Sequence, residues 1–382
     1  MMSQIRFDNM MKNSPLYDEI IPLSKILQVR MIGSKYKMLE SIMSIIQKDG
    51  ITGKTFFDVF CGGTSVGRFF KRKFLITSND ILYFSYVFQK ALINLNSYPN
   101  FEGLNFIAIE NKENEERVSK VLEYLNSIKG SKGFIYQHYT PASKISDGVE
   151  RMYFSEFNGE KIDAVRMKIE EWFKNNNINE NEYFYLIASL LLAVQKIANI
   201  SGTYGTYNKI WDARAKKTLK LQLIEIIDSK FEHKAFNDDS LTLLDKIDCD
   251  IAYVDPPYNN RQYISNYHIL ETIAKYDNPT INGKSGIRNY NGEKSTFCSN
   301  KTAKRDLLKL LSGLRAKYII LSYNSEGLLS KNEIKDIYEK IGLEYIKIHE
   351  FPYRRFKSNE NTKHNEVMEY IFTGRKPNSI KV

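Results

Sequence analysis

A short predicted strand that ends in Asp255-Pro256-Pro257-Tyr258 constrains this chain more than any other feature. The apolar run Ile251-Ala252-Tyr253-Val254 predicts the strand itself. The prolines must end it, because proline fixes φ at about −65° and has no N–H to donate to a sheet. A rigid loop therefore begins at the carboxyl end of a buried strand, the edge where open α/β sheets bind ligands.

This loop brings a carboxylate, a backbone carbonyl and an aromatic ring into one small volume. The two acceptors suit the exocyclic amino group of a planar base, and the ring of Tyr258 can stack on the face of that base. The alternative is a tight proline turn in which Asp255 is only a capping residue. That alternative leaves Tyr258 and the preceding apolar run unexplained, so we favour a binding site.

The order of the expected elements predicts the fold class. A strand at 55–60 is followed by the turn Gly62-Gly63, a helix at 65–73 and a strand at 74–78 that closes on Asn79-Asp80. Strand, glycine turn, helix and strand in this order form the first half of a doubly wound α/β sheet. Apolar spacing also predicts helices and strands elsewhere: helices at 36–48, 111–129, 163–175 and 183–200, and strands at 234–237, 251–254, 318–322, 345–351 and 367–373.

Composition limits the compartment and the partners. The chain has 382 residues, 42% hydrophobic and 26% charged, which is ordinary for a soluble globular protein. Lys and Arg exceed Asp and Glu by 55 − 45 = 10, which favours a polyanionic partner such as nucleic acid. Cys61, Cys249 and Cys298 show no CxxC spacing, so we expect no disulfide and no metal. With neither a signal peptide nor a membrane-spanning run, we expect a soluble intracellular protein.

The Asp-Pro-Pro-Tyr loop and its surroundings resemble the Dam-like, alpha-group N6-adenine DNA methyltransferases, in particular the methyltransferase halves of type IIS restriction-modification systems. The similarity runs from about residue 30 to about residue 373 and extends past the loop through 259–263, 265–268 and 270–272. The resemblance implies a Rossmann-like α/β sheet that binds S-adenosylmethionine and ends in an antiparallel hairpin. It also implies an inserted, mainly helical target-recognition domain.

On this basis we expect four segments: an N-terminal arm at 1–25, a first catalytic part with the cofactor site at 26–85, the target-recognition domain at 86–182, and a second catalytic part at 183–382. The resemblance further implies a cytoplasmic enzyme of a bacterial cell, associated with the nucleoid. We expect it to act as a monomer on double-stranded DNA, in a restriction-modification system with a cognate endonuclease.

The cofactor site is expected where two strand ends meet. Asp58 follows the first strand beside Phe60, Gly62 and Gly63, and it can hold the ammonium of S-adenosylmethionine. Asp80 ends the next strand, at the spacing where an acid meets ribose hydroxyls. By resemblance, residues 30–35 match the opening motif of the family and include three candidates, of which the lysine is expected at the cofactor's carboxylate: Arg30, Gly33 and Lys35.

Two details of this site are less direct. By resemblance, the segment 237–240 carries the acid that contacts the cofactor's adenine; we favour Asp239, with Asp238 as a helix N-terminal acid. The family usually has a second glycine where this chain has Thr64, so Gly62 and Gly63 must maintain the turn.

The expected chemistry is methyl transfer to the N6 amino group of an adenine flipped out of the duplex. Asp255 and the carbonyl of Pro256 would accept the two N–H bonds, and Tyr258 would stack on the base, with Pro257 keeping the loop rigid. Held in this way, the nitrogen presents its lone pair to the methyl group, so positioning and electrostatics supply most of the catalysis.

Three segments are candidates for DNA contact. By resemblance, 199–209 borders the target base, with Asn199, Tyr204 and Lys209 as contacts; the alternative is a glycine-rich loop after a core helix. Rings and donors alternate between 136 and 154, so Tyr139 and Arg151 are candidates for base readout, although a small hydrophobic core is an equal explanation. Arg354 and Arg355 lie in a basic loop that could meet phosphates or only solvent.

Two other functions remain open at this stage. An RNA adenine is possible, because a flipped base looks alike in DNA and RNA. A catalytically silent DNA-binding protein on the same fold is the other, although intact Asp58, Asp80 and Asp255 argue against it. Asp255 also argues against cytosine-N4 and protein-glutamine methyltransferases, which typically carry Ser and Asn at this position.

Overall fold

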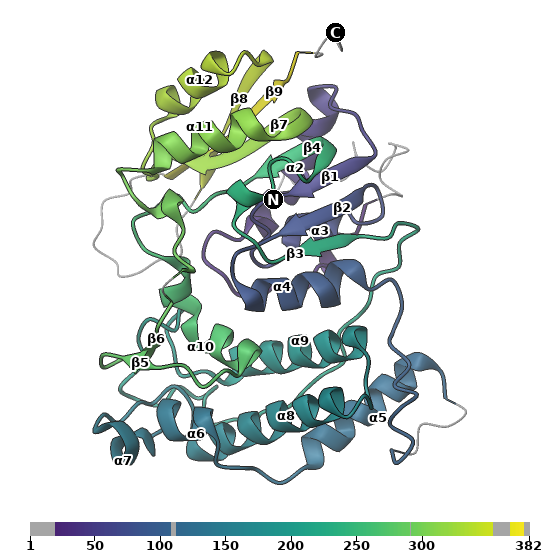
Figure 1. Ribbon diagram of the computed structural model, residues 1–382, viewed down its shortest axis with the longest axis vertical. Helices are drawn as coiled ribbons and strands as arrows, with labels where there is room; N and C mark the ends of the chain where they lie inside the picture. Colours follow the sequence, from purple (N-terminus) through teal and green to yellow (C-terminus); the bar gives the residue numbers. More distant parts are fainter. Residues whose placement is uncertain (1–19, 108–111, 291, 354–366, 378–382) are drawn as a thin grey trace.

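The computed structural model describes residues 20–107, 112–290, 292–353 and 367–377, built around a seven-stranded sheet (Figure 1). The strand order is β3-β2-β1-β4-β7-β9-β8. The bounds are β1 Thr55–Asp58, β2 Leu75–Asn79, β3 Lys234–Phe236, β4 Asp248–Val254, β7 Arg315–Asn324, β8 Glu344–Tyr353 and β9 Val367–Arg375. The first five strands in this order are parallel, whereas β9 pairs antiparallel with both β7 and β8. The expected α/β sheet with an antiparallel end is confirmed.

Both faces of the sheet are apolar, since helices cover both of them. Successive side chains of a strand point to opposite faces, so consecutive apolar residues pack on different sides. Phe56 and Ile251 face one side, where α2 (Leu39–Lys48) and α3 (Ser65–Phe70) pack. Their neighbours Phe57 and Ala252 face the other side, where α11 (Ala303–Gly313) and α12 (Lys331–Lys340) pack. The carboxyl ends of the parallel strands therefore lie at one edge, between two helical layers.

Between β2 and β3 the chain forms a helical region with a hydrophobic core of its own (Figure 1). Its helices are α4 Tyr83–Gln89, α5 Asn114–Ser127, α6 Phe134–Tyr139, α7 Ser143–Asp147, α8 Glu156–Lys174 and α9 Glu180–Ile197. In Figure 1 the sheet lies in the upper half and α5 to α9 lie below it, with α4 between them and α10 (Tyr263–Lys275) beside α9. Helix α9 packs in the same core as α5 and α8, so it crosses the boundary expected at residue 182 without a break in packing.

The polar segment 276–302, where apolar spacing predicted no helix or strand, contains regular structure. It forms a two-stranded antiparallel hairpin, β5 (Ile281–Asn282) and β6 (Ile287–Arg288), and a turn of 3₁₀ helix at Thr296–Cys298. The hairpin has only two residues in each strand, too few for side-chain alternation to show in the sequence. Within the described ranges, no helix is long and apolar enough to cross a membrane.

A buried carboxylate joins two helices of the helical region. Asp163 of α8 accepts hydrogen bonds from the amides of Gly133 (2.9 Å), Ile135 (3.0 Å) and Tyr136 (2.8 Å) at the start of α6. The hydroxyl of Tyr276 donates a fourth, at 2.8 Å. The carboxylate therefore satisfies N–H groups that have no partner within their own helix.

We predict that Asp163→Ala lowers the free energy of unfolding by roughly 2–4 kcal/mol, because it leaves several buried donors without an acceptor. Urea denaturation followed by circular dichroism measures the change. Asp336→Ala, an exposed acid on α12, is the control and should change stability by less than about 0.5 kcal/mol. Equal midpoints for the two variants would contradict the assigned role of Asp163.

Candidate active site

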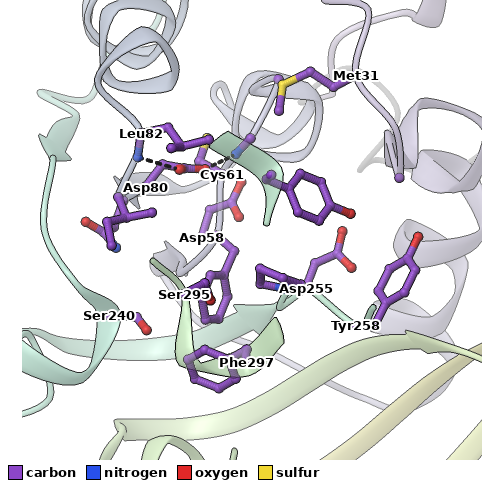
Figure 2. A pocket seen from close by; sticks show the side chains of 18 of the residues that line it. Met31, Asp58, Cys61, Asp80, Leu82, Ser240, Asp255, Tyr258, Ser295 and Phe297 are labelled. Atoms are coloured by element: carbon purple, nitrogen blue, oxygen red, sulfur yellow. Dashed lines mark hydrogen bonds between the residues drawn. The ribbon is translucent and has the colours of Figure 1, made fainter. Parts of the chain in front are cut away.

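The carboxyl ends of β1, β2 and β4 open into a pocket with an empty volume of about 1060 Å³. Figure 2 shows Asp58, Asp80 and Asp255 directed into it from these three strand ends, with Tyr258 at its side. Most residues expected at the cofactor and the catalytic loop line this pocket: Gly33, Lys35, Asp58, Phe60, Gly62, Gly63, Asp80, Asp239, Asp255, Pro257 and Tyr258. Arg30 and Pro256 are not among the lining residues: Pro256 is buried, and Arg30 is exposed with its amide bonded to Gln195.

Asp80 fastens the glycine turn to the neighbouring strand. Its two carboxylate oxygens accept hydrogen bonds from the amides of Gly62 (2.8 Å) and Leu82 (2.9 Å), drawn as dashed lines in Figure 2. The hydroxyl of Ser85 donates to the carbonyl of Gly62 at 2.6 Å, which holds the turn from the other side. Burial raises the pKa of Asp80 to about 6, although the hydrogen bonds from the amides lower it in part.

Thr64 adopts the conformation that explains why the family prefers glycine there. Its φ is 66°, in the left-handed region that residues with a Cβ atom rarely enter. The turn is nevertheless complete, since the amide of Thr64 donates to Cys61 and its carbonyl accepts from Arg68, both at 2.9 Å. Gly62, with φ at 51°, supplies the second left-handed residue.

Asp58 carries an acceptor that nothing in the described residues satisfies. Its side chain is buried and its Oδ2 atom has no hydrogen-bond partner. Burial raises the pKa of Asp58 to about 7, and hydrogen bonding with Cys61 lowers it only in part. A buried acid that lines a pocket and has an unpartnered oxygen is suited to a cationic ligand, because a cation would offset the cost of burying the charge.

Asp238 and Asp239 both line the pocket, directly before the 3₁₀ turn Ser240–Thr242. Asp239 is the N-cap, since its carboxylate accepts from the amide of Leu241 at 2.9 Å. Asp238 is held by its backbone, which exchanges two hydrogen bonds with the side chain of Asn79. We expected Asp238 as the acid at the helix N-terminus, but the acid that caps the turn is Asp239, which directly precedes it.

Lys35, which we expected at the cofactor's carboxylate, forms an ion pair with Asp255 of the Asp-Pro-Pro-Tyr loop in this structure. Its Nζ lies 3.0 Å from Oδ1 of Asp255 and 3.9 Å from Oε2 of Glu369, and all three side chains are largely buried. Burial alone would lower the pKa of Lys35, but the two carboxylates outweigh it and raise the pKa above its usual value. Burial raises the pKa of Asp255, and the ammonium of Lys35 lowers it in part.

Tyr258 packs closely against the opening segment. The peptide at Gly33 has φ at 78°, and an added Cβ atom there would lie 3.2 Å from the hydroxyls of both Tyr258 and Tyr263. Glycine is therefore required for the backbone to approach these rings. The Tyr258 ring meets the Tyr323 ring edge-on, with centroids 5.8 Å apart.

Two features of the pocket were missed in the sequence. Gln262 exchanges hydrogen bonds of 2.9 Å with both backbone groups of Ser295, which holds the segment 295–298 at the pocket wall. Phe297 of this segment meets Phe60 edge-on, with centroids 5.2 Å apart. The second feature is Glu369 on β9, which does not line the pocket but lies 3.9 Å from the ammonium of the lining residue Lys35. A single charged residue within the apolar strand 367–373 was the available signal for it.

The rings and donors between 136 and 154 form a core, as the alternative interpretation had it. Tyr139 is fully buried and donates to the carbonyl of Gly286 at 2.9 Å. Arg151 is 3% exposed, pairs with Asp147 and donates to the carbonyls of Lys284 (3.1 Å) and Gly283 (3.3 Å). This burial argues against our prediction of base readout by Tyr139 and Arg151. Both side chains donate hydrogen bonds to backbone carbonyls of the β5–β6 hairpin and so are not available at the surface.

Asn199 and Tyr204 also have structural positions. Asn199 is fully buried; its Nδ2 donates to the carbonyls of Met152 (3.0 Å) and Asn208 (2.9 Å), and its Oδ1 accepts from the amide of Asp212 at 2.9 Å. The carbonyl of Tyr204 accepts from the hydroxyl of Tyr153 at 2.8 Å. These contacts close the loop 199–212 at its base. The side chains of Asn199 and Tyr204 are both buried, so neither is at the surface for DNA contact in this arrangement.

Lys209, near the end of the same loop, is exposed. Arg354 and Arg355 lie outside the described residues.

Comparison with known proteins identifies the family. Residues 31–339 match the model of the D12 class N6 adenine-specific DNA methyltransferases, so the chain belongs to that family. It is 42% identical to the type II methyltransferase M.FokI of Planomicrobium okeanokoites over 92% of this chain and 54% of that protein. It is 36% identical to the modification methylase StsI of Streptococcus sanguinis, over 91% of this chain and 52% of that protein.

A third relative is matched over almost its whole length. The type II methyltransferase M.NlaIII of Neisseria lactamica is 37% identical over 89% of this chain and 97% of that protein. By contrast, the chain spans about half the length of M.FokI and StsI. The recognition of a Dam-like adenine methyltransferase pattern is confirmed by these matches.

We predict that Asn199→Ala lowers the free energy of unfolding by roughly 2–3 kcal/mol, because it removes three hydrogen bonds and leaves buried backbone groups unpaired. Lys209→Ala, in the same loop but exposed, is the matched control, with a change below about 0.5 kcal/mol. Urea denaturation of both variants distinguishes them. A stable Asn199→Ala variant would show that the loop is held by other contacts.

Proposed function

We propose that this protein transfers a methyl group from S-adenosylmethionine to the N6 amino group of adenine in duplex DNA. The observation that carries the proposal is the convergence of Asp58, Asp80 and Asp255 from three adjacent parallel strands into one pocket. An acid at each strand end gives separate anchors for an ammonium, for hydroxyls and for a base amino group. Membership of the D12 family supports the same reaction.

The residues of the pocket fit the cofactor that the family implies. The unpartnered Oδ2 of Asp58 would hold the ammonium group, and Asp80 would accept from the ribose hydroxyls while keeping its bonds to the turn. Asp238 is the better candidate for the cofactor's adenine, because the carboxylate of Asp239 already caps a helical turn. When bound, S-adenosylmethionine supplies a methyl group activated by a cationic sulfur.

The catalytic loop would hold the acceptor. Asp255 and the carbonyl of Pro256 would accept the two N–H bonds of the adenine, and Tyr258 would stack on the base after it leaves the duplex. Two directed acceptors fix the nitrogen so that its lone pair faces the methyl carbon, which lowers the entropic part of the barrier. The buried position of Asp255 strengthens this contact, since charges interact more strongly away from water.

Target recognition is proposed for the helical region, as expected for 86–182, together with the loop 199–212. The buried Arg151 and Tyr139 would shape this surface, and exposed residues such as Lys209 would contact DNA. Arg354 and Arg355 are proposed as phosphate contacts. The names of M.FokI, M.NlaIII and StsI as type II or modification enzymes support a role in a restriction-modification system. For this role we propose a cognate endonuclease as partner and action as a monomer.

We predict that Asp255→Ala slows methyl transfer by about 10²-fold or more, the usual effect of losing one preorganised contact to the reacting group. Labelled S-adenosylmethionine and genomic DNA from a host that lacks the enzyme measure the rate, with total RNA as the competing acceptor. Binding of S-adenosylmethionine should persist, because Asp255 contacts the acceptor. The control is Asp248→Ala, at the exposed start of the same strand. Transfer to RNA but not to DNA would overturn the proposal.

We also predict that affinity for S-adenosylmethionine increases severalfold from about pH 6 to about pH 7.5. The pKa of Asp58 is raised to about 7 by burial, so below that pH the carboxyl is mostly neutral and cannot attract the ammonium. Binding should then release a proton near neutral pH, which calorimetry in two buffers of different ionisation enthalpy detects. Asp58→Asn should abolish the proton release. Affinity that is independent of pH in the unaltered protein would place the ammonium elsewhere.

A further inference from the structure

Glu369 is a buried acid that the proposed reaction does not use. It lies on β9, opposite Asn324 of β7 in the strand register, and its side chain is 7% exposed. Its Oε2 atom has no hydrogen-bond partner, and burial raises its pKa above the usual value. An acid retained in this state carries a cost that a purely structural position on an apolar strand would not require.

The nearest cation is Lys35, which the acid shares with Asp255. The ammonium lies 3.0 Å from Asp255 and 3.9 Å from Glu369, and its side chain is 4% exposed. The contact with Asp255 is therefore a close ion pair, whereas the contact with Glu369 is at the limit of one. If the ammonium of Lys35 moved about one ångström toward Glu369, Glu369 would become its close partner in place of Asp255, since charge-assisted N–H···O bonds are about 2.8 Å long.

Such an exchange meets a requirement of the proposed chemistry. In the structure, Lys35 occupies the Oδ1 atom of Asp255, which has no other hydrogen-bond partner. A target amino group must obtain an acceptor on this carboxylate. If Lys35 then had no second anion, a buried ammonium would be left unpaired, which is strongly unfavourable.

We propose that Glu369 is a positioning residue that takes over the ammonium of Lys35 when the target amino group engages Asp255. The inference rests on the proposed methyl transfer and assigns Glu369 no contact with the substrate. The ammonium stays paired throughout, so entry of the base changes the partner of Lys35 without exposing a buried charge. Strand β9, the second from the edge of the sheet, thus contributes to the site through one acid.

Other titratable groups surround Lys35, Asp255 and Glu369, and the substitution of Glu369 leaves them unchanged. Asp58 faces Asp255 from β1, and Tyr253 of β4 faces Asp255 and Glu369. Tyr263 faces Asp255 and Lys35 from α10. None of them provides Lys35 with a second carboxylate at ion-pair distance within the described residues, where Asp255 and Glu369 are its two acidic partners. Removal of the Glu369 charge therefore isolates the proposed exchange.

The decisive variant is Glu369→Gln, which keeps the shape and removes the charge. Single-turnover transfer from labelled S-adenosylmethionine to unmodified genomic DNA is measured from about pH 5 to pH 9. We expect the plateau rate to fall roughly ten- to a hundredfold, the scale for losing a hydrogen bond to a charged group. The acid limb of the profile should move to lower pH, because Lys35 then pairs with Asp255 alone and lowers the pKa of that acid.

Two further variants complete the test. Glu369→Asp retains the charge and should recover much of the rate. If Glu369→Gln fails to fold, the rate of Glu369→Asp is the measurement that tests the inference. Glu350→Gln, on the neighbouring strand β8 and paired with Lys331 outside the pocket, is the matched control and should behave as the unaltered protein. Calorimetry should show affinities for S-adenosylmethionine within about twofold for all of them.

The outcomes separate this inference from the proposed function. A plateau rate for Glu369→Gln within twofold of the unaltered protein would overturn the inference and leave the function intact. A slow variant with an unmoved acid limb would also overturn it, because a poorly packed strand predicts that pattern. If the unaltered protein methylates no DNA, the proposed function fails first and the role of Glu369 in it falls with it.

Discussion

Asp255 and Lys35 form a buried ion pair at the place where the chemistry is proposed, and the arrangement of the surrounding strands depends on it. A carboxylate at the end of a buried strand is costly unless a cation or several donors face it. Lys35 supplies the cation from the opening segment, which must therefore fold back over the ends of β4 and β9. The closeness of Gly33 to Tyr258 and Tyr263 is the steric condition for that approach.

The other acids of the pocket are stabilised in different ways, and the differences indicate their roles. Asp80 is satisfied by two amides and acts as a fastener of the glycine turn. Asp58 has an oxygen without a hydrogen-bond partner and a pKa raised to about 7, which suits a group that binds a cationic ligand. Asp239 caps a helical turn, and Asp238 is the acid that we propose for the cofactor's adenine. Several acids can therefore share one pocket, because the partners of each carboxylate differ and suit it to a different role.

The helical region uses the same physical rule for structure. Asp163, Asn199 and Arg151 are buried polar side chains whose donors and acceptors are occupied by backbone groups far away in sequence. Together they connect α6, the loop 199–212 and the β5–β6 hairpin to α8 and the segment around Arg151. Polar residues in a glycine- and tyrosine-rich segment can therefore resemble a recognition surface while they serve to position one.

The sequence alone determined the elements whose signal is local. Prolines after an apolar run ended β4 at Asp255, glycines after β1 marked the turn at Gly62, and spacing placed Asp80 at the end of the neighbouring strand. These features follow from backbone geometry and side-chain alternation, so they hold before any tertiary contact forms. Family resemblance added the antiparallel end of the sheet and the cofactor.

Only the tertiary structure decided which polar side chains face the pocket and which are buried supports. The pairing of Lys35 with Asp255 and Glu369 joins residues more than a hundred positions apart, and no local pattern encodes such a distance. The burial of Tyr139, Arg151 and Asn199 likewise depends on helices that pack from separate segments. A side chain's partners set its charge state and its availability, and those partners exist only once the chain has folded.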